Sequence, residues 1–340
     1  MFKPKYSVGY NFDYDNFVGL IEKYKEHIES VYFPPPKKLL GSGRIIDEPQ
    51  SYKNDIISLI KKCNELGITP YMILNSTIVA SSQIDSVIEY TKDLHKKASL
   101  AHVTVTDPYL ITQIKKDIPN MFIEASTLCR IQKVQEAKYF KEIGVSRMTS
   151  DRETIRDIPV LKKLAEVLPL RVLANEGCIK NCIYKYAHYN MLSANVEEKP
   201  ILPFGKKFDR VKNATNEMDT LCVSTVGKHP HKVFSSPFIR PEDIKRYEGV
   251  TDIFKLSTRN FETDRIEKTL IAYIAQEYDG NLVDILNTAY IEGVFEYIDN
   301  KALNNVPFFE MLSTCDDDCD KCRFCHGLLV KTKARMRAKS

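Results

Sequence analysis

The stretch Thr69-Pro70-Tyr71-Met72-Ile73-Leu74 is a short, continuous apolar run that ends just before a polar residue, Asn75. A strand buried on both faces has this composition, whereas a strand with one face in water alternates apolar and polar residues. The segment before it, 53–67, carries one apolar stripe at helical spacing and ends at Gly67, where a helix C-cap belongs. This pair of segments predicts a parallel sheet whose strands alternate with helices.

The same unit recurs through the first 260 positions, and segment 130–143 repeats the helical pattern up to another glycine, Gly144. Eight strands that alternate with helices over this length are typical of a TIM-type (β/α)8 barrel, which we predict for residues 1–260. A doubly wound open sheet is the alternative, although no G-x-G-x-x-G follows the first strand. The expected strands are Tyr6–Tyr10, Ser30–Phe33, Thr69–Leu74, His102–Thr106, Met121–Ala125, Val145–Thr149, Leu170–Ala174 and Asp252–Leu256.

An insertion separates the seventh and eighth expected strands, from residue 175 to 250. Loops of this length are uncommon unless they have a function, and in a barrel this one emerges at the C-terminal face, where active sites lie. The remaining residues, 261–340, are expected to form a helical extension with helices at Asp264–Tyr278 and Leu282–Ile298. A cysteine-rich knot at 315–326 and a basic tail follow these helices.

The composition is that of a globular protein, with 340 residues of which 43% are hydrophobic. No apolar run approaches the roughly 20 residues of a membrane span, and the N-terminus has no signal-peptide core, so we expect a cytoplasmic protein without a membrane partner. Disulfides are rare in that compartment, so the nine cysteines are expected to have another role.

The net charge of +4 does not by itself predict nucleic-acid binding. The basic tail is either a disordered solubilising end or an arm for RNA or an acidic partner, and it contains Lys331, Lys333, Arg335, Arg337 and Lys339.

Seven of the cysteines fall into two groups. Cys178 and Cys182 follow the seventh expected strand, and Cys222 comes forty residues after Cys182 in the insertion. The second group is Cys315, Cys319, Cys322 and Cys325. Thiolate-rich sites select zinc, copper(I) or iron–sulfur clusters over magnesium or calcium. The C-x2-C-x2-C spacing of the second group resembles that of ferredoxin clusters and favours iron–sulfur, with zinc as the alternative.

The other two cysteines receive different interpretations. Cys63 lies on an apolar helical stripe and is expected in the core. Cys129 follows the fifth expected strand, so it is either a structural thiol or a further ligand. Seven ligands are one short of two four-cysteine clusters. Either one cluster keeps an open iron, or Cys129 or His326 supplies the last bond.

Six short motifs occur in order between about residues 28 and 290. They are Ser30-Val31-Tyr32-Phe33, Tyr71-Met72-Ile73-Leu74-Asn75, Val105-Thr106-Asp107, Glu124-Ala125-Ser126-Thr127, Ser150-Asp151-Arg152-Glu153, and Ile239-Arg240-Pro241-Glu242-Asp243-Ile244 followed by Phe254-Lys255-Leu256-Ser257-Thr258-Arg259. Together they resemble peptidase family U-32, the collagenase-like proteins now known largely as iron–sulfur enzymes. The last motif is the most specific, because it is similar to the family's F-K-I-E-G-R.

This resemblance implies a barrel with a 4Fe-4S cluster held by cysteines after the seventh strand and by a distal cysteine, the places of Cys178, Cys182 and Cys222. Family members are implicated in oxygen-independent hydroxylation of RNA bases or of a quinone precursor, with prephenate as oxygen donor in some, and others keep a protease label. The chain departs from the family pattern at two positions. Glu176 stands where the family has a histidine, and Thr258 where it has a glycine.

Barrel geometry brings the C-terminal end of each strand to the site, where Asn75, Asp107, Ser126, Arg152, Glu153, Glu176 and Arg259 are expected around the Cys178 loop. Arg152 and Arg259 suit the carboxylates of prephenate or the phosphates of RNA. Glu153 and Glu176 are candidate acid–base groups, or else they pair with these arginines. His188, with Asn190 and three interleaved tyrosines, either stacks on a base or packs within the insertion. His229 and His231, which flank Pro230, are expected in the site or in a surface loop.

Three functions follow from these features. The first is a redox enzyme that uses one or two clusters, and an electron donor, to hydroxylate RNA, a peptide or a small aromatic compound. The second is a peptidase-like hydrolase, although neither G-x-S-x-G nor H-E-x-x-H occurs. The third is a non-catalytic partner that binds a cluster for structure or electron transfer, as one half of a heteromer with another member of the family.

Overall fold

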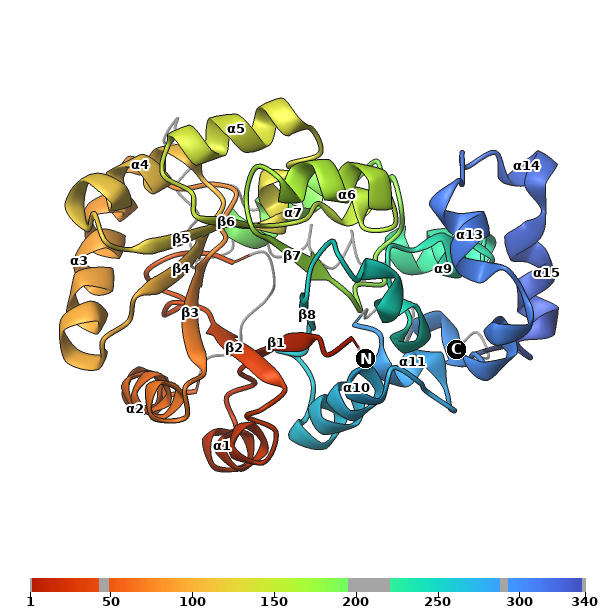
Figure 1. Ribbon diagram of the computed structural model, residues 1–340, viewed down its shortest axis with the longest axis horizontal. Coiled ribbons are helices and arrows are strands. Elements are labelled where there is room, and N and C mark those ends of the chain that lie inside the picture. Colours follow the sequence, from red (N-terminus) through yellow and green to blue (C-terminus); the bar gives the residue numbers. More distant parts are fainter. Residues whose placement is uncertain (1, 43–48, 195–220, 288–292, 338–340) are drawn as a thin grey trace.

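The computed structural model describes residues 2–42, 49–194, 221–287 and 293–337. Eight parallel strands form a closed barrel in which β1 pairs with β2 on one side and with β8 on the other (Figure 1). The predicted (β/α)8 barrel is therefore confirmed, and the alternative of an open sheet is wrong because the first and last strands meet. Every strand lies within two residues of its prediction: β1 (Lys5–Gly9), β2 (Ile28–Phe33), β3 (Thr69–Leu74), β4 (His102–Val105), β5 (Phe122–Ala125), β6 (Arg147–Thr149), β7 (Leu170–Leu173) and β8 (Ile253–Lys255).

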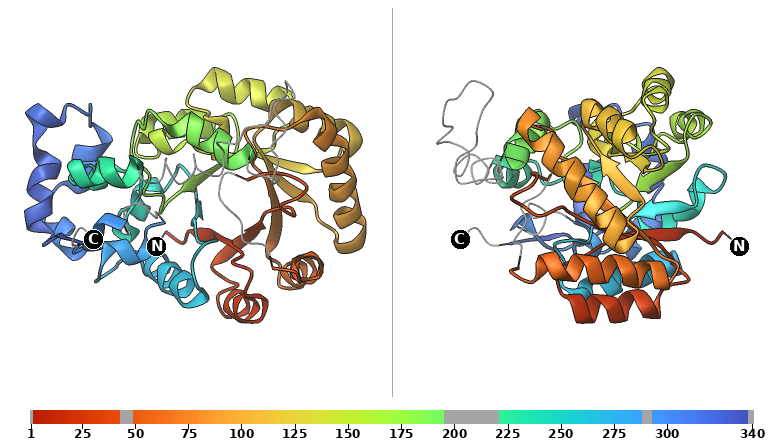
Figure 2. Two further views of the ribbon diagram at one scale, coloured as in Figure 1. Left: turned by 180° about the vertical axis from the view of Figure 1, so that it is seen from behind. Right: turned by 90° about the vertical axis from the view of Figure 1, so that its left-hand side faces the viewer.

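Helices cover the outside of the barrel, which is why the strands are apolar on both faces (Figures 1 and 2). Helix α2 (Tyr52–Glu65) buries its predicted stripe, including Cys63, and the chain leaves the helix at Gly67 with φ +71°. Cys63 is therefore a core residue, as predicted. The other outer helices are α1 (Tyr14–Lys23), α3 (Ser81–Ala98), α4 (Pro108–Asp117), α5 (Val134–Glu142), α6 (Ile158–Ala165) and α10 (Thr263–Ala275). Helix α10 packs beside α1 and completes the outer layer.

Four charged side chains lie inside the barrel near the N-terminal ends of its strands. We call Glu29, Glu124, Arg147 and Arg171 the floor network. Arg171 is fully buried, and its guanidinium lies 2.6 Å from Glu29 Oε2 and 2.8 Å from Glu124 Oε2. Arg147 Nη1 lies 2.7 Å from Glu29 Oε1. Burial acts to raise the pKa of Glu29, but the Arg171 and Arg147 cations outweigh it and lower the pKa to about 2.

The insertion and the C-terminal region contribute short elements. From the insertion the structure describes α7 (Lys185–Ala194), α9 (Lys232–Ser235) and the 3-10 helix η3 (Pro241–Tyr247). The chain then reaches η4 (Lys301–Asn305), α13 (Phe308–Ser313), α14 (Cys319–Cys322) and α15 (Phe324–Lys331). Helices α13 to α15 form a lobe beside the barrel, with α9 between them and the barrel wall (Figures 1 and 2).

Two predictions for the C-terminal region need correction. The helix predicted for Leu282–Ile298 is wrong, because α11 (Leu282–Ile285) has only four residues and β9 (Phe295–Tyr297) follows it after a segment outside the described residues. Strand β9 pairs antiparallel with β10 (Arg335–Met336). The basic tail is therefore ordered up to β10, where a disordered end was one expectation. Lys339 lies outside the described residues.

None of the helices in the described ranges is both long enough and apolar enough to cross a membrane.

Candidate functional site

A cavity of about 340 Å³ lies at the C-terminal ends of the barrel strands, the end predicted to carry the site. We call it the mouth cavity. Its walls come from β3, β8, the segments after β5 to β8, and α7 with residues near Cys222, so distant parts of the chain meet there. A cavity of this size suits a small molecule or a single nucleotide unit. Of the residues predicted at the mouth, Asn75, Ser126, Arg152, Glu176, His188 and Arg259 line it.

The mouth cavity is lined by Cys178, Cys182 and Cys222, which we call the mouth cysteines. None of the three forms a disulfide bond, and Cys222 is buried. Cys129 has a different setting, because its thiol donates to the backbone carbonyls of Val105 and Thr106 at 3.4 Å each. Burial raises the pKa of Cys129 to about 12. The structure thus brings together the three cysteines that the resemblance grouped, while Cys129 is already held by backbone oxygens.

Arg152 is the buried cation beside the mouth cysteines. Its guanidinium donates through Nη1 to the Tyr189 hydroxyl at 2.8 Å and lies close enough to Cys178 to act on its thiol electrostatically. Burial acts to lower the pKa of Arg152, but Cys178, Tyr189 and nearby carboxylates outweigh it and raise the pKa well above its usual value. Burial also raises the pKa of Cys178, and the Arg152 cation offsets part of that effect. A permanent positive charge therefore stands next to the sulfur.

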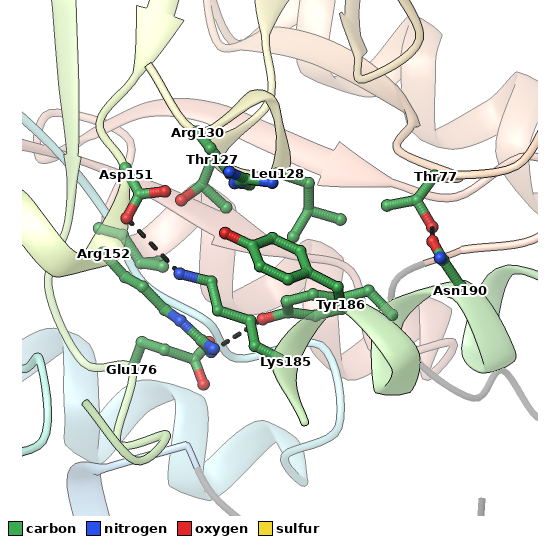
Figure 3. Close-up of a pocket in the computed structure, with 12 residues that line it drawn as sticks. Thr77, Thr127, Leu128, Arg130, Asp151, Arg152, Glu176, Lys185, Tyr186 and Asn190 are labelled. Atoms are coloured by element: carbon green, nitrogen blue, oxygen red, sulfur yellow. Dashed lines mark hydrogen bonds and ion pairs between the residues drawn. The ribbon is translucent and has the colours of Figure 1, made fainter. Parts of the chain in front are cut away.

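Helix α7 spans the mouth between loops that follow different strands (Figure 3). At one end, Thr77, which follows β3, bonds with Asn190 and Ser193 of α7 at 2.8 and 2.9 Å. Near the other end, Tyr189 accepts from Arg152, and the Tyr186 ring lies 4.0 Å from the Arg130 guanidinium carbon. Since both ends of α7 are anchored, the helix forms one wall of the mouth cavity.

Glu153 lies beside the site, and both of its carboxylate oxygens are engaged. Oε1 accepts from Lys185 Nζ at 2.9 Å, and Oε2 accepts from the Asn181 backbone N–H at 3.2 Å. Arg152 Nε lies 3.7 Å from Oε1. Glu153 therefore links α7 to the loop between Cys178 and Cys182, and its surroundings favour the paired interpretation over an acid–base group. Asp107 is likewise engaged outside the cavity, where it caps α4 through the Leu110 N–H at 2.7 Å.

Three further charged residues line the mouth cavity. Arg259 is buried, and its Nη1 donates to Ser42 at 3.4 Å. Lys255 Nζ lies 4.2 Å from the centre of the Tyr32 ring. Glu176 is 8% exposed and lies beside Arg152 (Figure 3). His188 and Tyr189 hold their rings 14° from parallel, with centres 6.4 Å apart. The cavity therefore offers several cations, one carboxylate and an aromatic edge.

A cluster and a single metal ion make different demands on these residues. Within the described ranges, no three His, Cys, Asp or Glu side chains converge closely enough to hold one metal ion. A four-iron cluster makes a different demand, because each cysteine binds a separate iron and the sulfurs need not converge on one point. Three soft thiols on one cavity beside a buried cation fit the anionic cluster that the family resemblance implies.

Comparison with known proteins gives the chain its family. The family model described as "Peptidase family U32" matches residues 19–200, more than half of the chain. The chain belongs to peptidase family U32. It is 28% identical over 320 residues to "Uncharacterized protease MJ1657" of Methanocaldococcus jannaschii, covering 91% of this chain and 90% of that protein.

Solved structures are more distant from this family member. "The Structure of the U32 Peptidase Mk0906" shares 14% identity over 60% of this chain and 85% of that chain, with a TM-score of 0.47. A tryptophan synthase A-subunit from Pyrococcus furiosus shares 9% identity over 57% of this chain and 86% of that chain, with a TM-score of 0.36.

Sequence reasoning missed two residues of this U32 site and one contact. Lys185 is buried and pairs with Glu153, and Lys255 lines the cavity from β8. Tyr189 was among the tyrosines expected to stack on a base, but its bond to Arg152 was not anticipated. The signal for Lys185 and Tyr189 was their spacing, since residues four apart on a helix share one face. Lys255 was visible in the last motif, although only Arg259 was chosen from it.

The four C-terminal cysteines lie in the lobe of α13 to α15, and none of them lines the mouth cavity described above. Cys322 is exposed and the other three are partly buried. His326 stacks on His231 with ring centres 3.6 Å apart, and His231 is buried, so its interpretation as a surface residue is wrong. His326 therefore belongs to this lobe and is not placed to complete the mouth group.

Proposed function

We propose that this chain is an iron–sulfur enzyme that hydroxylates an anionic aromatic substrate in the mouth cavity, with a small organic oxygen donor such as prephenate as the co-substrate and with its cluster on Cys178, Cys182 and Cys222. One observation carries the proposal: three cysteines that form no disulfide bond and the cations Arg152, Lys255 and Arg259 line the same cavity at the catalytic end of a barrel. Such a cluster would supply a redox centre.

The cysteine inventory supports three ligands at this site. Of the nine cysteines, Cys63 is in the core, Cys129 donates to backbone carbonyls and four lie in the C-terminal lobe. That leaves the mouth cysteines alone to hold a cluster there. A cluster held by these cysteines would border the cavity that receives the substrate.

The chain's own residues would bind and orient the substrate. Arg259 and Lys255 offer charged hydrogen-bond donors to a carboxylate or phosphate. Tyr189 and His188 give an aromatic edge against which a planar ring can pack. Glu176 is the carboxylate within the cavity that is placed to move a proton. The size of the cavity favours a prephenate-like molecule or a single RNA base over a folded peptide.

The test is anaerobic purification followed by iron and sulfide quantification. We expect brown protein that absorbs at about 400 nm, as thiolate-bound iron–sulfur centres do. The double variant Cys178→Ser/Cys182→Ser should lose the cluster at the mouth, and Cys129→Ser is the matched control that should keep it. Colourless wild-type protein without iron would overturn the proposal.

Peptide hydrolysis is the second candidate, because the relative from Methanocaldococcus jannaschii carries the name protease. The cavity hydroxyl of Ser126 accepts from the Leu128 N–H at 3.2 Å, a local capping bond. A serine nucleophile would instead need a histidine or other base as its partner. Cleavage of fluorescent casein that survives the loss of iron and is abolished by Glu176→Gln would favour hydrolysis over redox chemistry.

A further inference from the structure

We infer that Cys315, Cys319, Cys322 and Cys325, here called the tail cysteines, form a second metal centre that takes an iron–sulfur cluster. This centre is separate from the one proposed at the mouth, and the inference does not depend on that proposal. Its ligands come from the C-terminal lobe, in a part of the chain beyond the residues that match the family. All four thiols are free.

The local backbone gathers the four thiols. Cys319 and Cys322 are three residues apart on α14 and therefore lie on one face of its single turn. Arg323 then adopts a left-handed conformation with φ 53°, which ends α14 and starts α15 with Cys325 in its first turn. Asp317, between Cys315 and Cys319, is also left-handed with φ 67°. Such conformations are unfavourable for residues other than glycine, and they recur where a chain wraps around a ligand.

The thiols are close enough to influence one another. Burial and the neighbouring Cys315, Cys319 and Cys322 together raise the pKa of Cys325 to about 12. Four cysteines close together in one short segment, none of them in a disulfide bond, provide the thiolate-rich ligand set that iron–sulfur clusters select.

A buried cation lies behind the group. The Arg156 guanidinium donates to the backbone carbonyls of Ser236 at 2.8 Å and Phe238 at 3.0 Å, which are neutral partners. Burial lowers the pKa of Arg156 to about 10, and Tyr247, Asp243, Cys325 and Cys315 oppose this effect. Asp243 is itself paired with Arg240 and Arg246. A thiolate-bound cluster carries net negative charge, so a centre at the tail cysteines would add negative charge beside the Arg156 cation.

Two histidines flank the same region with unused nitrogens. His326 follows Cys325 directly, and its ring stacks on His231. Among the described residues, neither His231 Nε2 nor His326 Nδ1 has a hydrogen-bond partner, although both atoms are buried. Unsatisfied buried polar atoms are rare because they cost free energy. Next to a cluster, these nitrogens can donate to its sulfur atoms.

The spacing of the cysteines along the chain favours a cluster over zinc. A zinc ion binds four sulfurs at about 2.3 Å, so its ligands must converge on one point. No three potential ligands among the described residues do so. A cluster uses four separate irons and tolerates a wider arrangement, and the C-x2-C-x2-C run from Cys319 to Cys325 has the spacing that wraps such a cluster.

The tail cysteines also contact the loop that carries the mouth cysteines. Lys180 Nζ donates to the Cys315 carbonyl at 3.2 Å, and Asn181 Nδ2 donates to Asp317 Oδ2 at 2.6 Å. Lys180 and Asn181 lie between Cys178 and Cys182, whereas Asp317 lies between Cys315 and Cys319. The two ligand loops are thus joined directly, and a centre in the tail would hold the mouth loop in place.

Metal analysis of the full-length protein, purified without oxygen, tests the inference. We expect Cys319→Ser/Cys322→Ser to lose the iron and sulfide of one four-iron cluster, about four of each per chain, and to keep any iron held at the mouth. Cys178→Ser/Cys182→Ser should keep the iron of the tail, and Cys129→Ser should lose none. Full iron retention in the tail variant, or one zinc per chain that the tail variant lacks, would overturn the inference.

A measurement on the unaltered protein guards against a tail variant that does not fold. Cys322 is exposed, so native alkylation followed by mass spectrometry should label it readily if it is a free thiol. We expect Cys322 to be protected in iron-loaded protein and labelled after the iron is removed by chelation. Equal labelling before and after chelation would show that the tail cysteines hold no metal.

Discussion

At the floor of the barrel two glutamates face two arginines, whereas at its mouth Arg152, Lys255 and Arg259 surround a cavity. The floor charges form ion pairs 2.6 to 2.8 Å long. At the mouth, the cations line a cavity of about 340 Å³. The same residue types therefore form a closed ion-pair network at one end of the barrel and line a cavity at the other.

The largest expected effect is on the floor, with Arg171→Leu. Removing this guanidinium leaves the Glu29 and Glu124 carboxylates facing each other in the barrel interior. Loss of one partner from a buried ion pair costs about 3–5 kcal/mol of unfolding free energy. Urea unfolding of the full-length protein measures it, and Arg259→Leu at the mouth is the matched control. Equal losses in the two variants would remove the distinction between the two ends.

The floor should also make stability depend on pH. The pKa of Glu29 is lowered from 4.5 to about 2 in the folded protein, so its carboxylate stabilises the fold fully above pH 4.5. This contribution, roughly 3 kcal/mol, is lost as the pH falls from 4.5 towards 2. His102, whose ring lies 5.0 Å from that of Tyr71, has a pKa lowered by burial and adds a separate loss of stability that begins nearer its ordinary pKa of 6.5.

Unfolding measured from pH 7 to pH 2 in the wild type and in Glu29→Gln isolates the carboxylate. The variant should be less stable at neutral pH and should lack the steep loss below pH 4.5. Parallel curves for the two proteins would mean that Glu29 is not the group that titrates.

At the mouth, Arg259→Gln should weaken binding of an anionic ligand and change stability less than the floor variant does. A hydrogen bond to a charged group is worth about 1.5–3 kcal/mol, which corresponds to roughly 10- to 100-fold in affinity. Calorimetry with prephenate and with a short RNA, each at two salt concentrations, measures the loss and identifies the ligand class. An affinity that is unchanged for both ligands would place the anion site elsewhere.

The smallest effect is expected at the contact between the mouth loop and the tail. Asp317→Asn removes the ion pair with Lys180, which is 3.3 Å long, and surface pairs contribute about 0–1 kcal/mol. We expect faster amide hydrogen exchange in residues 178–182 and unchanged global stability. Asp318→Asn, which loses only the local pair with Lys321, is the control. Identical exchange in the two variants would show that the contact does not restrain the loop.

The barrel could be predicted because its signal is local. Each strand is a continuous apolar run, and each predicted strand lies within two residues of the observed one. The helix predicted for Leu282–Ile298 failed because β9 depends on pairing with β10, near the end of the described chain. Periodicity within a window carries no information about such a distant partner.

Part of the mouth cavity's lining could also be predicted from local sequence. Arg152, Glu176 and Arg259 follow strands directly, and their arrival at the cavity follows from barrel geometry. Glu153 also follows a strand, but its pairing with Lys185 depends on the path of the insertion, which no local pattern specifies. The contact between Asn181 and Asp317 joins residues 136 positions apart and could not be anticipated from either loop.

That contact has a consequence for how the protein is made. Translation proceeds at about 5–20 residues per second, so Asp317 is added roughly 7 to 27 seconds after Asn181, which lies 136 positions earlier. During this interval the nascent barrel exposes its cysteine loop without the partner that later restrains it. The cysteine loop therefore gains this contact only when the last part of the chain has been made. A chain truncated before residue 317 would form a barrel whose cysteine loop lacks this restraint.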